Sequence, residues 1–144
     1  DVNAELQSDI DQSIEKIDIY SDGLYVGNQP QNQFGAKLRW QVTDWLDVGS
    51  QYVYNDKFYA IYDVTDRDDP DYREQPFQLD SYGTLDARVR AKFNLFGLES
   101  YAQAQVYNVL DESYWYAGRD GGGYLKDGFP GFGRTSNFSL KVNF

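Results

Sequence analysis

The sequence predicts an all-β fold, an antiparallel transmembrane β-barrel, and three observations lead to this fold class. Several segments alternate between apolar and polar residues, as does a strand with one apolar and one wet face. These segments are longer than the roughly 5–6 residues that are usual for strands of globular proteins. Short and long connections alternate between them, as in outer-membrane barrels. A soluble sheet with a solvated, charged face is the alternative.

The N-terminal part, residues 1–30, is predicted to be a long extracellular hairpin that leads into the first strand. Apolar and polar residues alternate in its two arms, turn-forming residues lie between them at 8–13, and residues 27–30 break the strand pattern. The many charged and polar side chains favour a hairpin in water over a membrane span.

The spanning strands are predicted in residues 34–62, 83–110 and 134–144. In the first stretch, a short turn at Thr43-Asp44 separates residues 34–42 from residues 46–62, where Asp56 breaks the apolar face. In the second stretch, a tight connection at residues 94–97 joins two alternating segments. Single-chain barrels have at least about 8 strands. We therefore expect these strands to be the C-terminal part of a larger barrel, with completion by other chains as the alternative.

The last strand runs to the end of the chain, and we expect it to close the barrel and to carry its assembly signal. Phe138, Leu140, Val142 and Phe144 lie on one side of a period-2 ribbon, with polar residues on the other. The last strand of a barrel pairs with the first, so that no edge is left in lipid. Taken alone, this stretch fits the edge strand of a soluble β-sandwich equally well.

Composition excludes several classes of function. The 144 residues carry a formal net charge of −10 and contain no Cys, Met or His. These absences remove disulfides, thiolate ligands, the usual zinc ligand and the commonest general base. The acidic balance argues against nucleic acid as a partner. No pair of side chains has a spacing that indicates catalysis, so we predict neither an enzyme nor a cofactor.

Four short motifs carry a resemblance to a known family. They are Val26-Gly-Asn-Gln-Pro30, Tyr82-Gly-Thr-Leu-Asp86, Asn108-Val-Leu-Asp111 followed by Tyr114, and Gly131-Phe-Gly-Arg-Thr135, which runs on to the terminal Phe144. In this order, from about Gly23 onward, the chain resembles the C-terminal barrel region of TonB-dependent outer-membrane receptors, particularly those of Bacteroidetes.

The resemblance implies a barrel of about 22 strands with a plugged lumen, located in the bacterial outer membrane with its C-terminus in the periplasm. The partners that it implies are outer-membrane lipid, the rest of the barrel, an N-terminal plug, and TonB acting through an N-terminal part that these residues lack. A surface lipoprotein lid, as in the glycan- and peptide-importing branch of the family, is a further partner left open.

An acidic stretch at residues 63–71 is a weak candidate for a metal site, with Asp66, Asp68, Asp69 and Asp71 as ligands. Its spacing does not match a calcium-binding EF-hand, because the required Gly is missing and Phe77 stands where the last ligand belongs. A solvated outer loop is the favoured interpretation, since runs of charge are usually solvated.

The long connection at residues 111–133 holds the candidate substrate contacts, which are Tyr114, Trp115, Tyr116, Arg119 and Asp120. Aromatic rings beside a cation and an anion could grip a sugar, a peptide or a chelate by stacking and charge-assisted hydrogen bonds. An aromatic girdle with a flexible tip is the alternative.

The predicted strands also present alternating cations, namely Lys37, Arg39, Arg88, Arg90 and Lys92. In a large barrel they would line the lumen or contact a plug, and in a soluble sheet they would face water. The expected function is import of a scarce nutrient, such as chelated iron, a vitamin, a glycan or a peptide. A passive porin-like barrel and a soluble, aromatic-rich, carbohydrate-binding β-sandwich are the two alternatives.

Overall fold

The computed structural model describes residues 24–62 and 76–143, and all regular structure within them is β. The strands are β1 (Gln33–Gln41), β2 (Leu46–Asn55), β3 (Phe58–Tyr59), β4 (Gln78–Leu79), β5 (Tyr82–Leu95), β6 (Leu98–Tyr107), β7 (Trp115–Asp120), β8 (Leu125–Pro130) and β9 (Thr135–Val142). Across these two ranges, no helix is long and apolar enough to cross a membrane. The predicted all-β fold class is confirmed.

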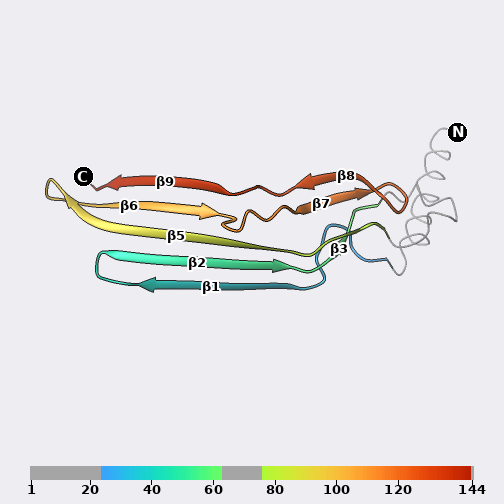
Figure 1. Cartoon of the computed structure of the whole chain (residues 1–144), viewed down its shortest axis with the longest axis horizontal. Coiled ribbons are helices and arrows are strands. Elements are labelled where there is room, and N and C mark those ends of the chain that lie inside the picture. Colours follow the sequence, from blue (N-terminus) through green and yellow to red (C-terminus); the bar gives the residue numbers. More distant parts are fainter. Residues whose placement is uncertain (1–23, 63–75, 144) are drawn as a thin grey trace, which may run out of the picture. The chain divides into compact units, whose positions relative to one another are not determined.

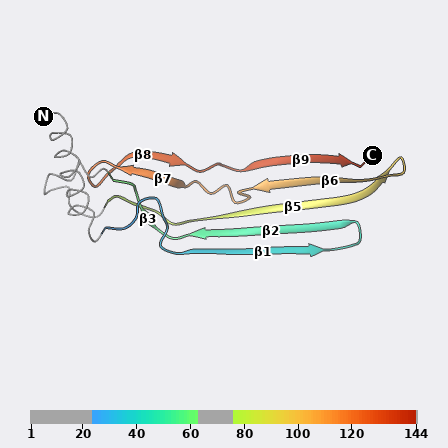
Figure 2. The same cartoon turned by 180° about the vertical axis from the view of Figure 1, so that it is seen from behind.

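The chain divides into two compact units. The sheet unit consists of the described residues within 30–57, 80–114 and 130–144, and the loop unit of those within 1–29, 58–79 and 115–129. The sheet unit is one antiparallel sheet in the order β1-β2-β5-β6-β9. These five strands lie side by side in Figure 1 and, from behind, in Figure 2.

The register aligns the apolar positions of all five strands on one face. Ser50 of β2, for example, lies opposite Leu38 of β1 and Ala87 of β5. Because neighbours in register point to the same side, rows of apolar side chains cross the sheet, while Lys37, Arg88 and their neighbours form rows on the other side. The alternation predicted for each separate strand is confirmed as one continuous face.

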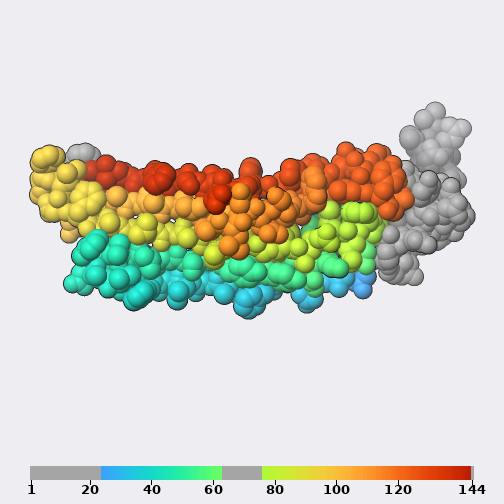
Figure 3. Space-filling model, in the orientation of Figure 1, coloured from blue at the N-terminus to red at the C-terminus, as the bar shows by residue number. Residues whose placement is uncertain are grey.

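This apolar face is exposed. The side chains of Leu38, Trp40 and Phe138 have exposed fractions of 64%, 61% and 79%, values far from those of a core. All five strands of the unit belong to a single sheet, so the unit itself supplies no second layer to cover them. In the space-filling view, the bands of these strands run next to one another (Figure 3).

The loop unit holds the buried apolar side chains of the described residues, which are Phe58, Ala60 and Leu79. The two short strands β3 and β4 pair antiparallel, and the ring of Tyr25 stacks on that of Tyr59 with centroids 5.0 Å apart. In Figure 1 the arrows of β7 and β8 run in opposite directions, as in a hairpin, and these two strands form their own two-stranded sheet.

Both short connections of the sheet are tight turns. In the β1–β2 turn, the amide of Val42 donates to the carbonyl of Leu46 at 2.9 Å, and the amide of Leu46 donates to Thr43 Oγ1 at 3.0 Å. In the β5–β6 turn, Phe96 and Gly97 have φ of 53° and 87°. Positive φ at both central residues is the mark of a type I′ hairpin turn, whose twist matches that of the strands.

Three predicted boundaries are wrong. Residues 46–62 do not form one strand, because the chain leaves the sheet at Asp56, whose carboxylate accepts hydrogen bonds from the Asn32 side chain at 3.1 Å and the Lys57 amide at 2.8 Å. Asp56 lies outside the strand, and these two hydrogen bonds lower the pKa of its carboxyl group because they stabilise the charged form. The strand predicted to reach 110 ends at Tyr107, since Asn108 has a left-handed φ of 49°.

The third correction concerns the long connections, which contain strands of their own: β4 within residues 63–81, and β7 and β8 within residues 111–133. Most of the hairpin predicted at residues 1–30 lies outside the described residues, as does the acidic stretch from Asp63 to Asp71.

The β5–β6 turn can be tested with Gly97→Ala. A residue with a Cβ at this left-handed position costs roughly 1–2 kcal/mol, so we expect a lower midpoint in urea unfolding of the full-length protein refolded in detergent. Gly35→Ala is the matched control, because an added Cβ in this strand would meet only the Tyr52 carbonyl, at 3.9 Å. Equal midpoints for the two variants would contradict the turn.

Candidate functional site

The polar face of the sheet holds a fixed group of charges centred on Asp47. This carboxylate, with 8% of its side chain exposed, accepts a hydrogen bond from Arg39 Nε at 3.0 Å and another from Arg88 Nη2 at 3.2 Å. Asp47 on β2 thus forms ion pairs with an arginine of β1 and an arginine of β5, the two strands next to β2.

Arg90 is held independently of this group. Its Nη2 and Nε donate to Gln103 Oε1 at 2.7 and 3.0 Å, and its guanidinium lies 4.7 Å from the ring centroid of Tyr101, close enough for a cation–π contact. The wall arginines predicted from the alternation are therefore brought together on one face, in defined orientations.

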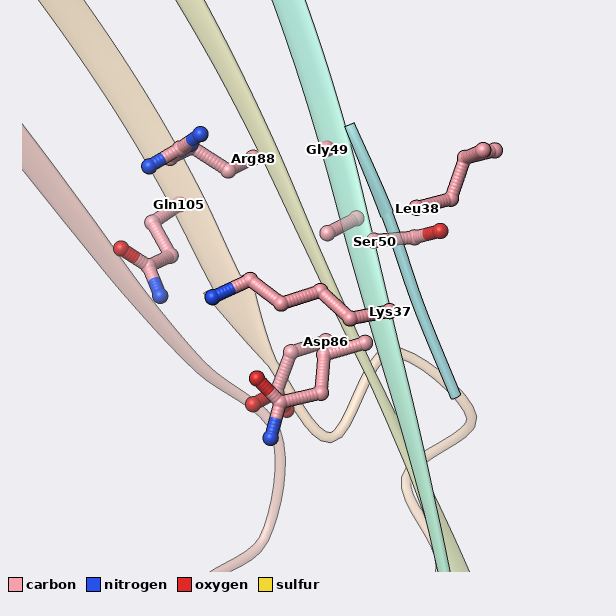
Figure 4. A pocket seen from close by; sticks show the side chains of 9 residues that line it. Lys37, Leu38, Gly49, Ser50, Asp86, Arg88 and Gln105 are labelled. Atoms are coloured by element: carbon pink, nitrogen blue, oxygen red, sulfur yellow. The ribbon is translucent and has the colours of Figure 1, made fainter. Parts of the chain in front are cut away.

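The lysines of this face, unlike Arg39 and Arg88, form no ion pair with a carboxylate of the described residues. Among the described residues, no carboxylate lies within 4 Å of the amines of Lys37, Lys92 or Lys141. A hollow of about 90 Å³ lies beside Lys37, bordered by Arg88 and Gln105 among others. Figure 4 shows these three polar side chains on one side of the sheet and Leu38 on the other.

The five candidate substrate contacts divide into two groups. Tyr114 stacks on Tyr82, with centroids 4.1 Å apart and an angle of 17° between the rings. Asp120 is 6% exposed and accepts hydrogen bonds from the amides of Phe77, Gly122 and Gly123 at 2.8, 3.0 and 3.0 Å. Both side chains are thus already engaged within the fold, and the burial of Asp120 leaves little of its carboxylate open to a ligand.

Trp115, Tyr116 and Arg119 are exposed on β7. The Tyr116 ring contacts that of Phe129 at 6.3 Å between centroids, and Gly128 faces the indole of Trp115 so closely that a Cβ would clash with it. The β7–β8 hairpin thus presents two supported aromatic rings and a cation at its surface, and their binding role stays a prediction.

Three of the sequence motifs meet at one junction in the sheet unit. Asp86 Oδ1 accepts the amide of Asn108 at 3.0 Å, Asp111 Oδ1 accepts the amide of Arg134 at 2.9 Å, and Tyr82 and Tyr114 form the stack described above. The motifs Tyr82–Asp86, Asn108–Tyr114 and Gly131–Thr135 are therefore parts of one structural element.

Asn108 is the centre of this junction. Its amide nitrogen donates to the carbonyls of Glu112 at 2.9 Å and Phe132 at 3.0 Å, and its oxygen accepts the Glu112 amide at 3.0 Å. Asn108 begins one of the sequence motifs, but no contact was predicted for its side chain. An Asn directly after an alternating segment was the available signal, since Asn tolerates left-handed φ and bonds its own backbone neighbours.

The remaining predicted residues are placed only in part. Phe138, Leu140 and Val142 lie on the apolar face of β9, which is paired with β6 and forms one edge of the sheet, while Phe144 lies outside the described residues. The weak metal candidates Asp66, Asp68, Asp69 and Asp71 also lie outside them. In the ranges 24–62 and 76–143, no group of three acidic residues could hold a metal ion.

The fold is similar to parts of known receptors. Two crystal structures of the ferric-catecholate import receptor Fiu from E. coli K12 match this chain, the open form at 22% identity with a TM-score of 0.57 and the closed form at 23% with 0.56. Each match covers 77% of this chain and 15% or 14% of the receptor. BauA, the ferric preacinetobactin receptor from Acinetobacter baumannii, matches at 21% identity and a TM-score of 0.61, over 86% of this chain and 16% of the receptor.

No family model and no curated protein matches the chain. At these identities the structural likeness establishes the fold alone: part of the antiparallel wall of a β-barrel, not closed within this chain. The chain spans only a small share of each receptor's length. The expected likeness to Bacteroidetes receptors in particular gains no support from neighbours of these two sources.

The junction can be tested with Asn108→Ala, which removes three side-chain hydrogen bonds and puts Ala at a φ of 49°. With about 0.5–1.5 kcal/mol for each bond and the left-handed backbone in addition, we expect a loss of roughly 2–4 kcal/mol in unfolding free energy. Limited proteolysis between residues 109 and 133 should also become faster. Glu112→Ala is the control, because Glu112 contributes only backbone groups, and an equal effect of both changes would contradict the assigned role.

Proposed function

We propose that this chain is a C-terminal segment of the barrel wall of a TonB-dependent outer-membrane receptor that imports a scarce nutrient. One observation carries the proposal: a single-layer antiparallel sheet has one continuous apolar face that is exposed, and an opposite face that bears charges. In water, such a face would expose large apolar side chains over all five strands. In a bilayer, the same face meets lipid and the charged face meets the lumen.

Strand length supports the same conclusion. β1, β2, β5 and β6 have 9, 10, 14 and 10 residues, and a transmembrane β-strand needs about 9–11. Ala102 lies in the middle of β6, and aromatic residues such as Tyr54 and Phe93 lie toward strand ends, whereas Phe138 lies in the middle of β9. Aromatic residues at strand ends are typical of the interfacial girdles of a lipid-facing wall.

The connections suggest an orientation. Both short turns and the end of β9 lie at the same end of the sheet in Figure 1, and the long connections leave from the other end. Outer-membrane barrels have short periplasmic turns and longer extracellular loops. We therefore assign the turns and the C-terminus to the periplasm, and the β7–β8 hairpin to the cell surface.

Among the nutrient classes, chelated iron is favoured. Both neighbouring receptors are named for ferric chelates, and the β7–β8 hairpin presents Trp115, Tyr116 and Arg119, which could stack on an aromatic chelator and pair with its negative charge. The proposed partners are outer-membrane lipid, the remaining strands, a plug, and TonB acting through a part outside these residues. A surface lipoprotein lid is left out, because no observation favours it.

A passive porin-like barrel is the second candidate, since it would need the same wall. It differs in having no energy requirement and no selective binding at the hairpin. The soluble carbohydrate-binding sandwich is disfavoured by the exposed apolar face of the sheet unit, which a sandwich would cover with a second sheet.

The lipid-facing assignment can be tested with Ala91→Arg in the full-length receptor. A charged side chain near the middle of the lipid face costs up to about 2–4 kcal/mol, so we expect much less folded barrel in outer-membrane fractions, measured by the shift in gel mobility on heating. Asn137→Arg places the same charge on the polar face of β9 and should assemble normally. Normal assembly of both variants would contradict the assignment.

The hairpin can be tested with Trp115→Ala and Arg119→Ala. Loss of one stacking or charge-assisted contact of about 1.4 kcal/mol lowers affinity about tenfold, so we expect a tenfold weaker binding of ferric catecholate chelates to purified receptor. Uptake by iron-starved cells should require TonB. Lys126→Ala, a change to a cation on the neighbouring strand β8, is the control, and TonB-independent uptake would favour the porin-like barrel instead.

A further inference from the structure

The ring of Tyr124 lies flat on the backbone at the tip of the β7–β8 hairpin. A Cβ added to Gly121 would be 2.6 Å from Cζ of this ring and 2.9 Å from both Cε2 and Oη. Because the nearest atom lies between two atoms that are equally far away, Gly121 is over the face of the ring and not beside its edge. Cβ atoms essentially never come within 3.0 Å of other atoms, so only glycine at this position leaves room for the ring.

Hydrogen bonds fix the turn that carries this ring. The amide of Gly121 donates to the carbonyl of Tyr124 at 2.9 Å. Between them, Gly122 and Gly123 have φ of 93° and 84°, which is the conformation of a type I′ hairpin turn. The buried carboxylate of Asp120 accepts the amides of these two glycines. The three consecutive glycines thus each have a structural role, since one leaves room for the ring and two form the turn.

The opposite face of the Tyr124 ring is open. The residue is 58% exposed although Gly121 covers one face, and no ring of the described residues stacks on it. Tyr114 has the same arrangement in completed form. Its ring lies against Gly131, where a Cβ would clash with it, and the ring of Tyr82 stacks on its other face with centroids 4.1 Å apart. The hairpin tip thus has the glycine and the first ring of such a stack, and its second ring is missing.

We propose that Tyr124 binds an aromatic ring of the imported iron chelate by stacking, and that Gly121 is the positioning residue that holds the Tyr124 ring flat. The inference rests on the proposed function, which assigns this hairpin to the cell surface and favours chelated iron. It adds the class of chelate: a catecholate or phenolate presents a planar ring for offset stacking, whereas an aliphatic hydroxamate does not. Since the Tyr124 ring is already held on one side, little side-chain freedom is lost on binding.

Titration of the purified full-length receptor with the iron complex of 2,3-dihydroxybenzoate tests the contact. Tyr124→Leu removes the ring, and we expect about fivefold weaker binding, the effect of losing one stacking contact. Tyr124→Phe keeps the ring and is the matched control, which should bind as the unchanged receptor does. Equal binding by the two variants, or no binding of this complex by the unchanged receptor, would overturn the proposal. With the iron complex of acetohydroxamate, which has no ring, the two variants should not differ, and a fivefold loss there as well would overturn the assignment to aromatic chelates.

Gly121→Ala tests the positioning role. Gly121 does not have the left-handed φ of its two neighbours, so the added methyl group displaces the Tyr124 ring without straining the backbone. We expect a loss of binding equal to that of Tyr124→Leu, and no further loss when both changes are combined, because the glycine acts only through the ring. A further loss in the double variant would mean that Gly121 supports the hairpin in general, and the positioning role would then be wrong.

Assembly and uptake separate this inference from the proposed function. A folded barrel with TonB-dependent uptake, whose affinity for the catecholate complex does not depend on Tyr124, sinks only the stacking contact. Absence of a folded barrel from the outer membrane, or uptake without TonB, sinks the receptor assignment whatever the Tyr124 variants bind.

Discussion

Register between the five strands is the constraint on which the rest of this structure depends. Side chains alternate with a period of two, so a slip by one residue would send Leu38 and Phe138 to the polar face and Arg88 to the apolar one. Two tight turns fix the register at one end. Next to the β1–β2 turn, Asp47 contacts Arg39 on one neighbouring strand and Arg88 on the other. A slip of β1 or β5 would separate these charges and leave a buried carboxylate unpaired.

At the other end of the sheet, the junction around Asn108 marks where wall gives way to loops. The chain turns there through a left-handed residue whose side chain bonds the backbone on both sides of the inserted residues 113–131. The stack of Tyr82 on Tyr114 closes the same region. Because these contacts hold the two ends of the insertion together, the β7–β8 hairpin can vary in sequence without disturbing the pairing of β6 with β9.

Much of the wall could be predicted from sequence, because alternation is a local signal that repeats over many residues. The spans of β1, β5 and β9 agree with the prediction to within a residue or two. The ends of β2 at Asn55 and of β6 at Tyr107 were missed because the next residues form side-chain hydrogen bonds that a periodic pattern does not record: Asp56 with the Asn32 side chain and the Lys57 amide, and Asn108 with the backbone of Glu112 and Phe132. The short strands β3 and β4 have two residues each, too few to show any period.

The candidate site was predicted less completely, for a related reason. Sequence gives residue type but not what a side chain already binds. Asp120 looked like a ligand contact, yet its carboxylate holds the turn of the hairpin through two glycine amides. Conversely, three of the four motifs that carried the family resemblance had no assigned contacts, and the structure brings these three into one junction.

The register also determines which charges share the polar face of the sheet, and the sign of this face is opposite to that of the whole chain. The chain has a formal net charge of −10, yet the polar face of its main sheet is richer in cations than in acids. Thirteen of the 23 acidic residues lie in residues 1–23 and 63–75, outside the described residues. The excess of cations on this face thus results from which residues the strands place there, and not from the overall composition of the chain. Any surface that covers it must bring carboxylates or leave these cations in water, since burying an unpaired ammonium is costly.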